Sequence, residues 1–171
     1  MINPVDPVNY PDSDKDLSNT DIRCGCRPTA SKVAVMSEKS GRCLCGGVQF
    51  SLSGPLRPVV YCHCSMCRRS SGHFVAATAC ASSSLRLLRA DSLQWYRSSD
   101  QAQRGFCSVC GSNLFWRPES GTHISIMAGT LDDPSGLQGA AHIYVHSKGD
   151  YYTVEDGLPA HVDGAHGIAV P

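Results

Sequence analysis

The sequence lacks an excess of charge of either sign. Its 171 residues carry 15 Lys and Arg against 15 Asp and Glu, so the formal net charge is zero. Nucleic acids and anionic membranes attract proteins through clustered positive charge. This balance argues against a nucleic-acid partner and against binding to a membrane surface.

Long apolar segments are also missing. No stretch comes near the roughly 18 apolar residues that a membrane-spanning helix needs. The first 21 residues hold five aspartates and three prolines, whereas an export signal has an apolar centre. We therefore expect a cytoplasmic protein. Because the cytoplasm is reducing, we expect its ten cysteines to bind metal rather than to form disulfides.

Helical periodicity is absent, since no segment keeps it for three turns. Short runs of β-branched and aromatic residues alternate instead with Gly, Pro, Ser and Asp, which is typical of strands joined by turns. We predict an all-β fold with one short helical turn after Cys64. The predicted strands cover residues 48–52, 59–64, 73–80, 85–88, 93–96, 113–117, 123–128 and 142–146.

The predicted β domain covers residues 41–160. Residues 1–40 are rich in Asp, Ser, Asn and Pro, a composition that predicts a disordered N-terminal tail. Cys24 and Cys26 lie in this tail, and we expect them to be unstructured thiols. Residues 161–171 are expected to form a loose C-terminal tail.

Seven of the eight cysteines in the predicted domain fall in three close groups. C-x-C and C-x-x-C spacings let neighbouring thiolates reach one zinc ion, whose sulfur ligands lie about 2.3 Å away. The eighth, Cys80, ends an apolar strand and is expected in the core. The groups are the pair Cys43 and Cys45, the triplet Cys62, Cys64 and Cys67, and the pair Cys107 and Cys110.

These groups divide naturally into four ligands and three. The two pairs provide four thiolates, a closed set typical of structural zinc. The triplet leaves one coordination position free, as catalytic zinc does. We therefore expect two zinc ions per chain, one structural and one catalytic. Two alternatives stay open: the triplet binds no metal, or His63 closes it as a fourth ligand. Strand alternation points the His63 side chain to the opposite face.

Several motifs, taken together and in order, resemble the family of glutathione-dependent formaldehyde-activating enzymes, also known as the centromere-protein-V family. The resemblance covers about residues 41–159 and excludes both tails. It implies a β-tent fold of antiparallel sheets and the same division into structural and catalytic zinc. It also implies a carbon–sulfur lyase that acts on a glutathione adduct. The motifs are GRCLCGGVQF, YCHCSMCRRSSG, RGFCSVCGSNLF, LDDP, HIYV and GLP.

A zinc ion held by three thiolates is a weak Lewis acid that favours a soft fourth ligand such as a thiol. Binding deprotonates that thiol, and the thiolate can then attack an electrophilic carbon. In reverse, zinc stabilises the departing thiolate, so one site serves both directions. Cys62, Cys64 and Cys67 are thus the predicted catalytic centre.

Other residues near the motifs are candidates for substrate contacts. Arg68, Arg69 and Arg104 are expected to bind the carboxylates of glutathione, because arginine holds carboxylate with two parallel hydrogen bonds. His63 and His142 are candidate acid–base groups. A rival hypothesis is a non-catalytic zinc module for protein interaction. The apolar faces of an open sheet also allow a homodimer.

Overall fold

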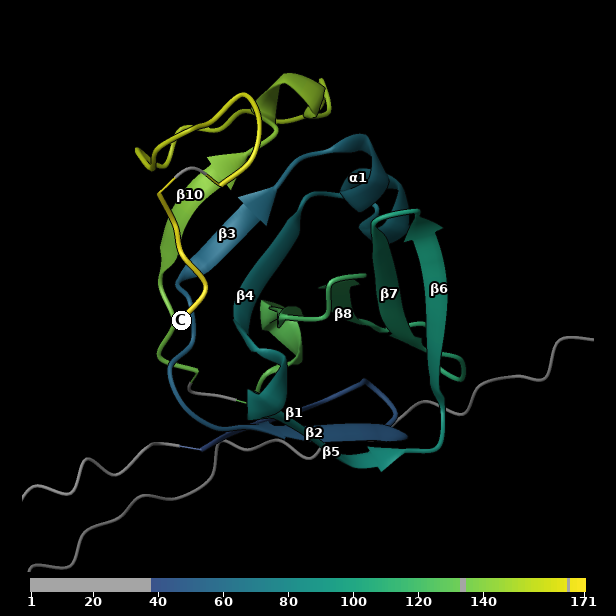
Figure 1. Ribbon diagram of the computed structural model, residues 1–171. Helices are drawn as coiled ribbons and strands as arrows, with labels where there is room; N and C mark the ends of the chain where they lie inside the picture. Colours follow the sequence, from purple (N-terminus) through teal and green to yellow (C-terminus); the bar gives the residue numbers. More distant parts are fainter. Residues whose placement is uncertain (1–37, 133–134, 166) are drawn as a thin grey trace, which may run out of the picture. The chain divides into compact units, whose positions relative to one another are not determined.

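The computed structural model describes residues 38–132, 135–165 and 167–171 (Figure 1). Cys24, Cys26 and nearly all of the predicted N-terminal tail lie outside the described residues, as do residues 133 and 134 of the LDDP motif. The described residues form ten strands, one short α-helix and three single 3₁₀ turns. The predicted all-β fold is therefore confirmed. No helix among these residues is long and apolar enough to cross a membrane.

A small antiparallel sheet contains three strands in the order β1-β2-β5. Gly41 on β1 faces Phe50 on β2. A side chain at Gly41 would overlap the Phe50 ring and lie 2.6 Å from the Thr130 carbonyl oxygen. Glycine at this position therefore allows β1 to close over the buried ring. The strands are β1 (Lys39–Arg42), β2 (Val48–Leu52) and β5 (Leu85–Ala90).

The large sheet contains seven strands in the order β10-β3-β4-β9-β8-β7-β6. All of its pairings are antiparallel except β10 with β3, which is parallel. The strands are β3 (Val59–Cys62), β4 (Val75–Ala81), β6 (Leu93–Ser99), β7 (Ala102–Cys107), β8 (Asn113–Pro118), β9 (His123–Met127) and β10 (Gly139–Ile143).

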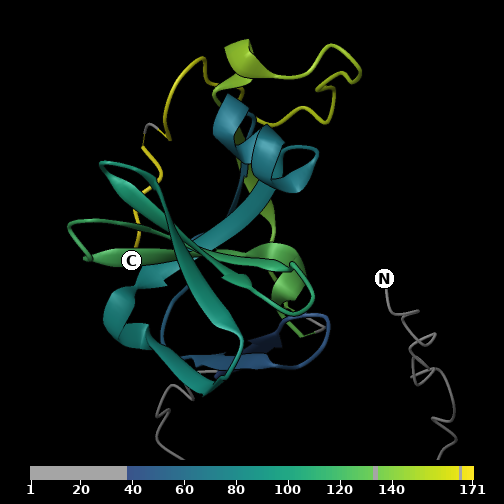
Figure 2. The ribbon, with the colours of Figure 1, turned by 90° about the vertical axis from the view of Figure 1, so that its right-hand side faces the viewer.

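The remaining elements are short. Helix α1 (Ser65–Ser71) follows β3 directly, where a helical turn was predicted. The 3₁₀ turns are η1 (Ser82–Ser84), η2 (Ala128–Thr130) and η3 (Val145–Ser147). Figures 1 and 2 show α1 and β10 at one end of the described domain and the small sheet at the other.

The main apolar core joins the two sheets. Phe50 from the small sheet meets Phe115 from the large sheet edge-on, with ring centroids 5.1 Å apart. Both side chains are fully buried, and burial of such rings contributes roughly 2–3 kcal/mol each. Cys80 is also fully buried in this cluster, as predicted. Cys43 and Cys107 belong to the same cluster, so the core continues into the two cysteine pairs, whereas the triplet lies in a separate smaller cluster with Val75 and Ala77.

The first residues beyond the predicted domain end are hydrogen-bonded to the segment after β10. The Tyr144 N–H donates to the Asp163 carbonyl, and the Val145 N–H donates to the His161 carbonyl. A bridge also pairs His142 with Ala160. The boundary at residue 160 stays a prediction, and residues 161–163 are hydrogen-bonded to residues 142–146.

Candidate functional site

Cys43, Cys45, Cys107 and Cys110 come together although 62 residues separate Cys45 from Cys107. Their four sulfur atoms all lie within 4.8 Å of one another. The Cys45 sulfur is 3.6 Å from the sulfur of Cys43 and 3.6 Å from that of Cys107. A disulfide would require about 2.05 Å. A zinc tetrahedron with 2.3 Å arms has edges of about 3.8 Å, so the group fits a closed zinc site.

Neighbouring donors support these sulfur atoms. The Val48 N–H donates to the Cys43 sulfur at 3.2 Å. The hydroxyls of Ser92 and Ser112 lie 3.1 Å and 3.2 Å from the sulfurs of Cys107 and Cys110. Such donors hold the sulfur atoms in position around a bound ion.

Cys62, Cys64 and Cys67 form the second group, at the junction of β3 and α1. Cys62 ends β3, Cys64 caps the N-terminus of α1, and Cys67 lies in its first turn. Their sulfurs also lie within 4.8 Å of one another. Hydrogen bonds from the Cys62 and Cys67 thiols lower the pKa of Cys64, and the bond with Cys64 raises the pKa of Cys62. The group therefore favours a thiolate at Cys64.

His63 turns away from this group, as strand alternation predicted. Its Nδ1 is 2.6 Å from the Tyr152 hydroxyl, and its Nε2 is 2.8 Å from Nδ1 of His142. His142 Nε2 is 2.9 Å from a carboxylate oxygen of Asp156. Both ring nitrogens of His63 are thus in use, and the cysteine group does not include it. The alternative in which His63 closes the triplet is wrong.

A cavity of about 380 Å³ opens onto the three-cysteine group. Apolar side chains from β3, β4 and β9 form much of its wall, including Val60, Ala77 and Met127. Its polar lining contains two guanidinium groups, one imidazole and one phenol. These belong to Arg57, Arg104, His123 and Tyr144. The four-cysteine group contributes none of the described lining residues, so the two groups differ in access.

Of the three predicted substrate-binding arginines, Arg104 alone lies in the cavity. It comes from β7, is 8% exposed, and its Nη2 lies 3.9 Å from the Cys67 sulfur. The Arg68 Nε instead donates to the Ser147 carbonyl at 2.8 Å, and Arg69 is exposed. Neither lines the cavity in the described residues. A substrate role for Arg68 and Arg69 stays a prediction.

The predicted acid–base residues also lie outside the cavity lining. Both His63 and His142 are buried. Burial, together with the nearby charge of His142, lowers the pKa of His63 to about 4. A proton-transfer role for these histidines stays a prediction. Apart from the three cysteines and the two arginines, the titratable groups that line the cavity in the described part of the chain belong to His123 and Tyr144.

Sequence reasoning missed Tyr144, which was assigned to a strand over residues 142–146. The strand ends at Ile143, and Tyr144 adopts φ 56° and ψ 39°. It is the one residue other than glycine with positive φ in the described chain. A bulky side chain in this conformation is strained, and such strain gathers at functional sites. Here it accompanies a phenol that lines the cavity.

The described residues thus form an all-β domain with a four-cysteine group and a three-cysteine group that faces a cavity, and either group could hold a metal ion. Comparison with family models agrees: residues 38–147 match the model of the glutathione-dependent formaldehyde-activating enzyme. The chain belongs to this family.

Among solved structures, one match is the crystal structure of a Rhodobacter sphaeroides protein. It is 28% identical, and the alignment covers 55% of this chain and 88% of that chain with a TM-score of 0.46. None of the curated proteins compared with the chain matches it.

Proposed function

We propose that the protein is a zinc-dependent carbon–sulfur lyase or synthase that acts on an adduct of glutathione or a related thiol. The observation that carries this proposal is the difference between the two cysteine groups. One provides four sulfurs and is closed, whereas the other provides three and faces a cavity. Three protein ligands with access to substrate are typical of catalytic zinc.

A zinc ion bound by Cys62, Cys64 and Cys67 would accept the substrate thiol as its fourth ligand and keep that thiol deprotonated. The protein itself balances the charge there. Three thiolates outweigh one divalent ion by a negative charge, and an incoming thiolate adds another. Arg104, buried beside the Cys67 sulfur, offsets this charge in surroundings of low dielectric constant.

Tyr144, which lines the cavity, is the candidate donor of the proton that this reaction needs. When a thiolate sulfur attacks a carbonyl carbon, the carbon–sulfur bond forms and the oxygen must gain a proton. The proton that the thiol releases balances the one that the oxygen gains. Burial raises the pKa of Tyr144, and the charges of Cys62 and Cys64 raise it further. The phenol therefore stays protonated and able to donate to that oxygen.

Tyr144→Phe removes this donor and keeps the ring. We expect the rate of adduct formation from glutathione and formaldehyde to fall about a hundredfold, the usual scale for a lost general acid. Zinc content and KM for the thiol should not change. Tyr151→Phe, at an exposed tyrosine, is the matched control. Equal rates for Tyr144→Phe and the wild type would exclude Tyr144 from proton transfer.

A cobalt-substituted sample tests the proposal directly. We expect two metal ions per chain and a change in the visible bands when glutathione is added. S-methylglutathione, which has the same carboxylates and no free thiol, should leave the bands unchanged. A full complement of metal with no response to glutathione would contradict the proposal.

One feature favours the rival class, a non-catalytic interaction module. Leu44 and Val109 lie between the paired cysteines of the closed group and are 63% and 74% exposed. Exposed apolar side chains beside a rigid metal site suit a protein contact. If no thiol changed the visible bands of the cobalt-substituted protein, the interaction module would become the leading function.

A further inference from the structure

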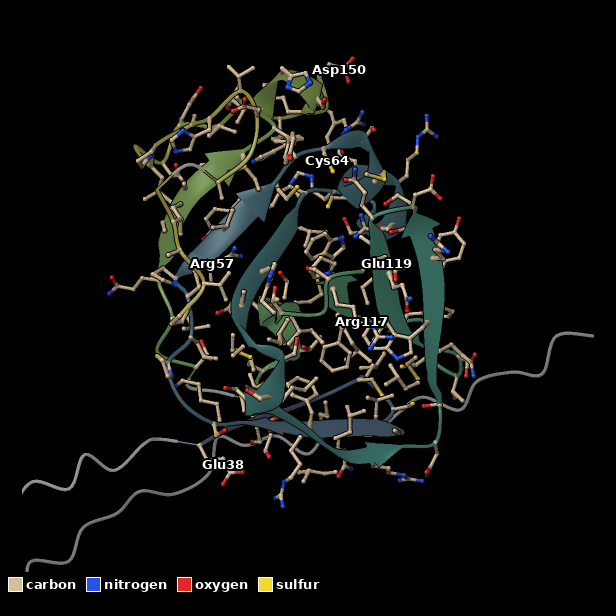
Figure 3. The ribbon with its side chains drawn as sticks, in the orientation of Figure 1. Glu38, Arg57, Cys64, Arg117, Glu119 and Asp150 are labelled. Atoms are coloured by element: carbon tan, nitrogen blue, oxygen red, sulfur yellow. The ribbon has the colours of Figure 1, made fainter. Side chains whose placement is uncertain are left out.

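Arg57 is held firmly against β4. It lies in the segment between β2 and β3, and its N–H donates to the Ala79 carbonyl at 2.9 Å. The Thr78 hydroxyl donates to the Arg57 carbonyl. In the side chain, Nη2 donates to the Ala77 carbonyl at 3.1 Å. Figure 3 shows Arg57 beside β3 and β4, and Cys64 near α1. The side chain is thus fixed along the strand that forms the cavity wall.

The charge of Arg57 has no acidic partner among the described residues. The ion pairs found there all belong to other cations. Its Nε is also the one buried side-chain nitrogen or oxygen in the described chain without a hydrogen-bond partner. Burial lowers the pKa of this guanidinium. The side chain as a whole is half-buried, and a charge that is partly withdrawn from water is stabilised by a partner of opposite sign. An anion entering the cavity would supply the pair.

The two cavity arginines have different surroundings. Arg104 already lies beside the Cys67 sulfur. Arg57 donates a side-chain hydrogen bond to the Ala77 carbonyl. Ala77 pairs with Val60 on β3 and with Met127 on β9. These three apolar side chains line the cavity. The cavity therefore offers a sulfur-binding end with Arg104 and, across an apolar stretch, a second cation.

Strand register gives the spacing between the two. Cys62 pairs with Val75, and Val60 pairs with Ala77 two residues further along β4. Two residues of a strand span roughly 7 Å. In a peptide thiol, one further extended residue beyond the cysteine spans up to about 3.6 Å on top of the cysteine's own length. A carboxylate one or more residues beyond the cysteine can therefore reach Arg57 while the sulfur lies at the cysteine group.

We propose that Arg57 binds a carboxylate of the thiol substrate and selects peptide thiols whose carboxylate lies at least one residue beyond the cysteine. This inference rests on the proposed function and adds a specificity-determining residue to it. Free cysteine, whose carboxylate is too near its sulfur, and uncharged thiols are then poor ligands.

Trp116, which lines the same cavity, provides a binding signal that does not depend on turnover. Fluorescence titrations of the zinc-loaded wild type would compare glutathione with its glycyl monoethyl ester, which masks only the carboxylate beyond the cysteine. We expect the ester to bind at least about tenfold more weakly, because a charge-assisted hydrogen bond is lost. Equal affinities would overturn the inference with no variant needed.

Variants then assign the effect to Arg57. Arg57→Met should bind glutathione as weakly as the wild type binds the ester, with ester affinity unchanged. Arg57→Lys keeps the charge and should retain part of the preference. Arg86→Met, at an arginine whose side chain is 73% exposed, is the matched control and should behave as the wild type. If Arg57→Met still bound glutathione more tightly than the ester by the wild-type factor, the assignment to Arg57 would be contradicted.

S-methylglutathione separates this inference from the proposed function. If thiol binding fails but the carboxylate contact stands, glutathione and S-methylglutathione bind equally, and both lose affinity in Arg57→Met. If the carboxylate contact fails but thiol binding stands, glutathione and its ester bind equally, and S-methylglutathione binds weakly. When both contacts are present, esterification and S-methylation of glutathione each weaken its binding.

Discussion

Cys107→Ser is expected to leave the domain unfolded or to lower its melting temperature drastically. Structural zinc in small domains contributes apparent binding free energies of about 10–16 kcal/mol, which is as large as the whole stability of a typical domain. Cys107 is fully buried in the main core, so the serine would also place a hydroxyl there. Circular dichroism melts and metal content per chain would measure the effect.

Cys80→Ser is the control for this change. Cys80 is equally buried in the same core but lies outside both cysteine groups. Its replacement should cost only the roughly 1–3 kcal/mol of burying a hydroxyl, and both zinc ions should remain. If the two variants melted alike with unchanged zinc, the four-cysteine group would have no structural role.

The large effect expected at Cys107 follows from what the group joins. Cys43 and Cys45 lie in the turn between two strands of the small sheet, whereas Cys107 ends β7 of the large sheet. A shared ion would therefore link the two sheets at a point where the core continues between them. Cys45 and Cys107 are 62 residues apart in the sequence, so without the ion the folded state loses a link between distant parts of the chain.

Local patterns in the sequence predicted the cysteine groups well. Close spacing brings ligands together whatever the fold, so the triplet could be read directly. The pairing of Cys43 and Cys45 with Cys107 and Cys110 required only the count of four ligands. Burial of Cys80 followed from its place at the end of an apolar strand.

Features that depend on distant partners could not be predicted in this way. Strand β7 was missed because AQRGFC has no β-branched residue, and its pairing with both β6 and β8 makes it a strand. The parallel pairing of β10 with β3 joins segments 80 residues apart. Arg57 precedes a proline in an ordinary loop sequence. Only the fold reveals that its guanidinium lines the cavity.

The open group should respond to mutation in the opposite way from the closed one. Cys64→Ser removes one of three sulfur ligands, and we expect zinc to fall from two ions per chain to one. Glutathione would then lose its metal contact, and turnover should fall at least about a hundredfold, because a metal ion contributes several kcal/mol to such reactions. The rate of formaldehyde loss with glutathione would measure this.

The fold should nevertheless survive Cys64→Ser, for a reason specific to its position. Cys64 is the N-cap of α1, where its sulfur accepts the Cys67 N–H. Serine is among the best N-cap residues, so the substitution preserves the cap while it removes the soft ligand. Ser65→Ala, at the next residue, whose side chain is exposed, is the control and should keep both zinc ions.

Wild-type turnover in Cys64→Ser with a single zinc would show that the three-cysteine group is not the catalytic centre. A cooperative melt near that of the wild type, together with lost turnover, is expected instead. Because Cys107→Ser should lose the fold itself, the two substitutions assign structural and chemical roles to the two groups independently.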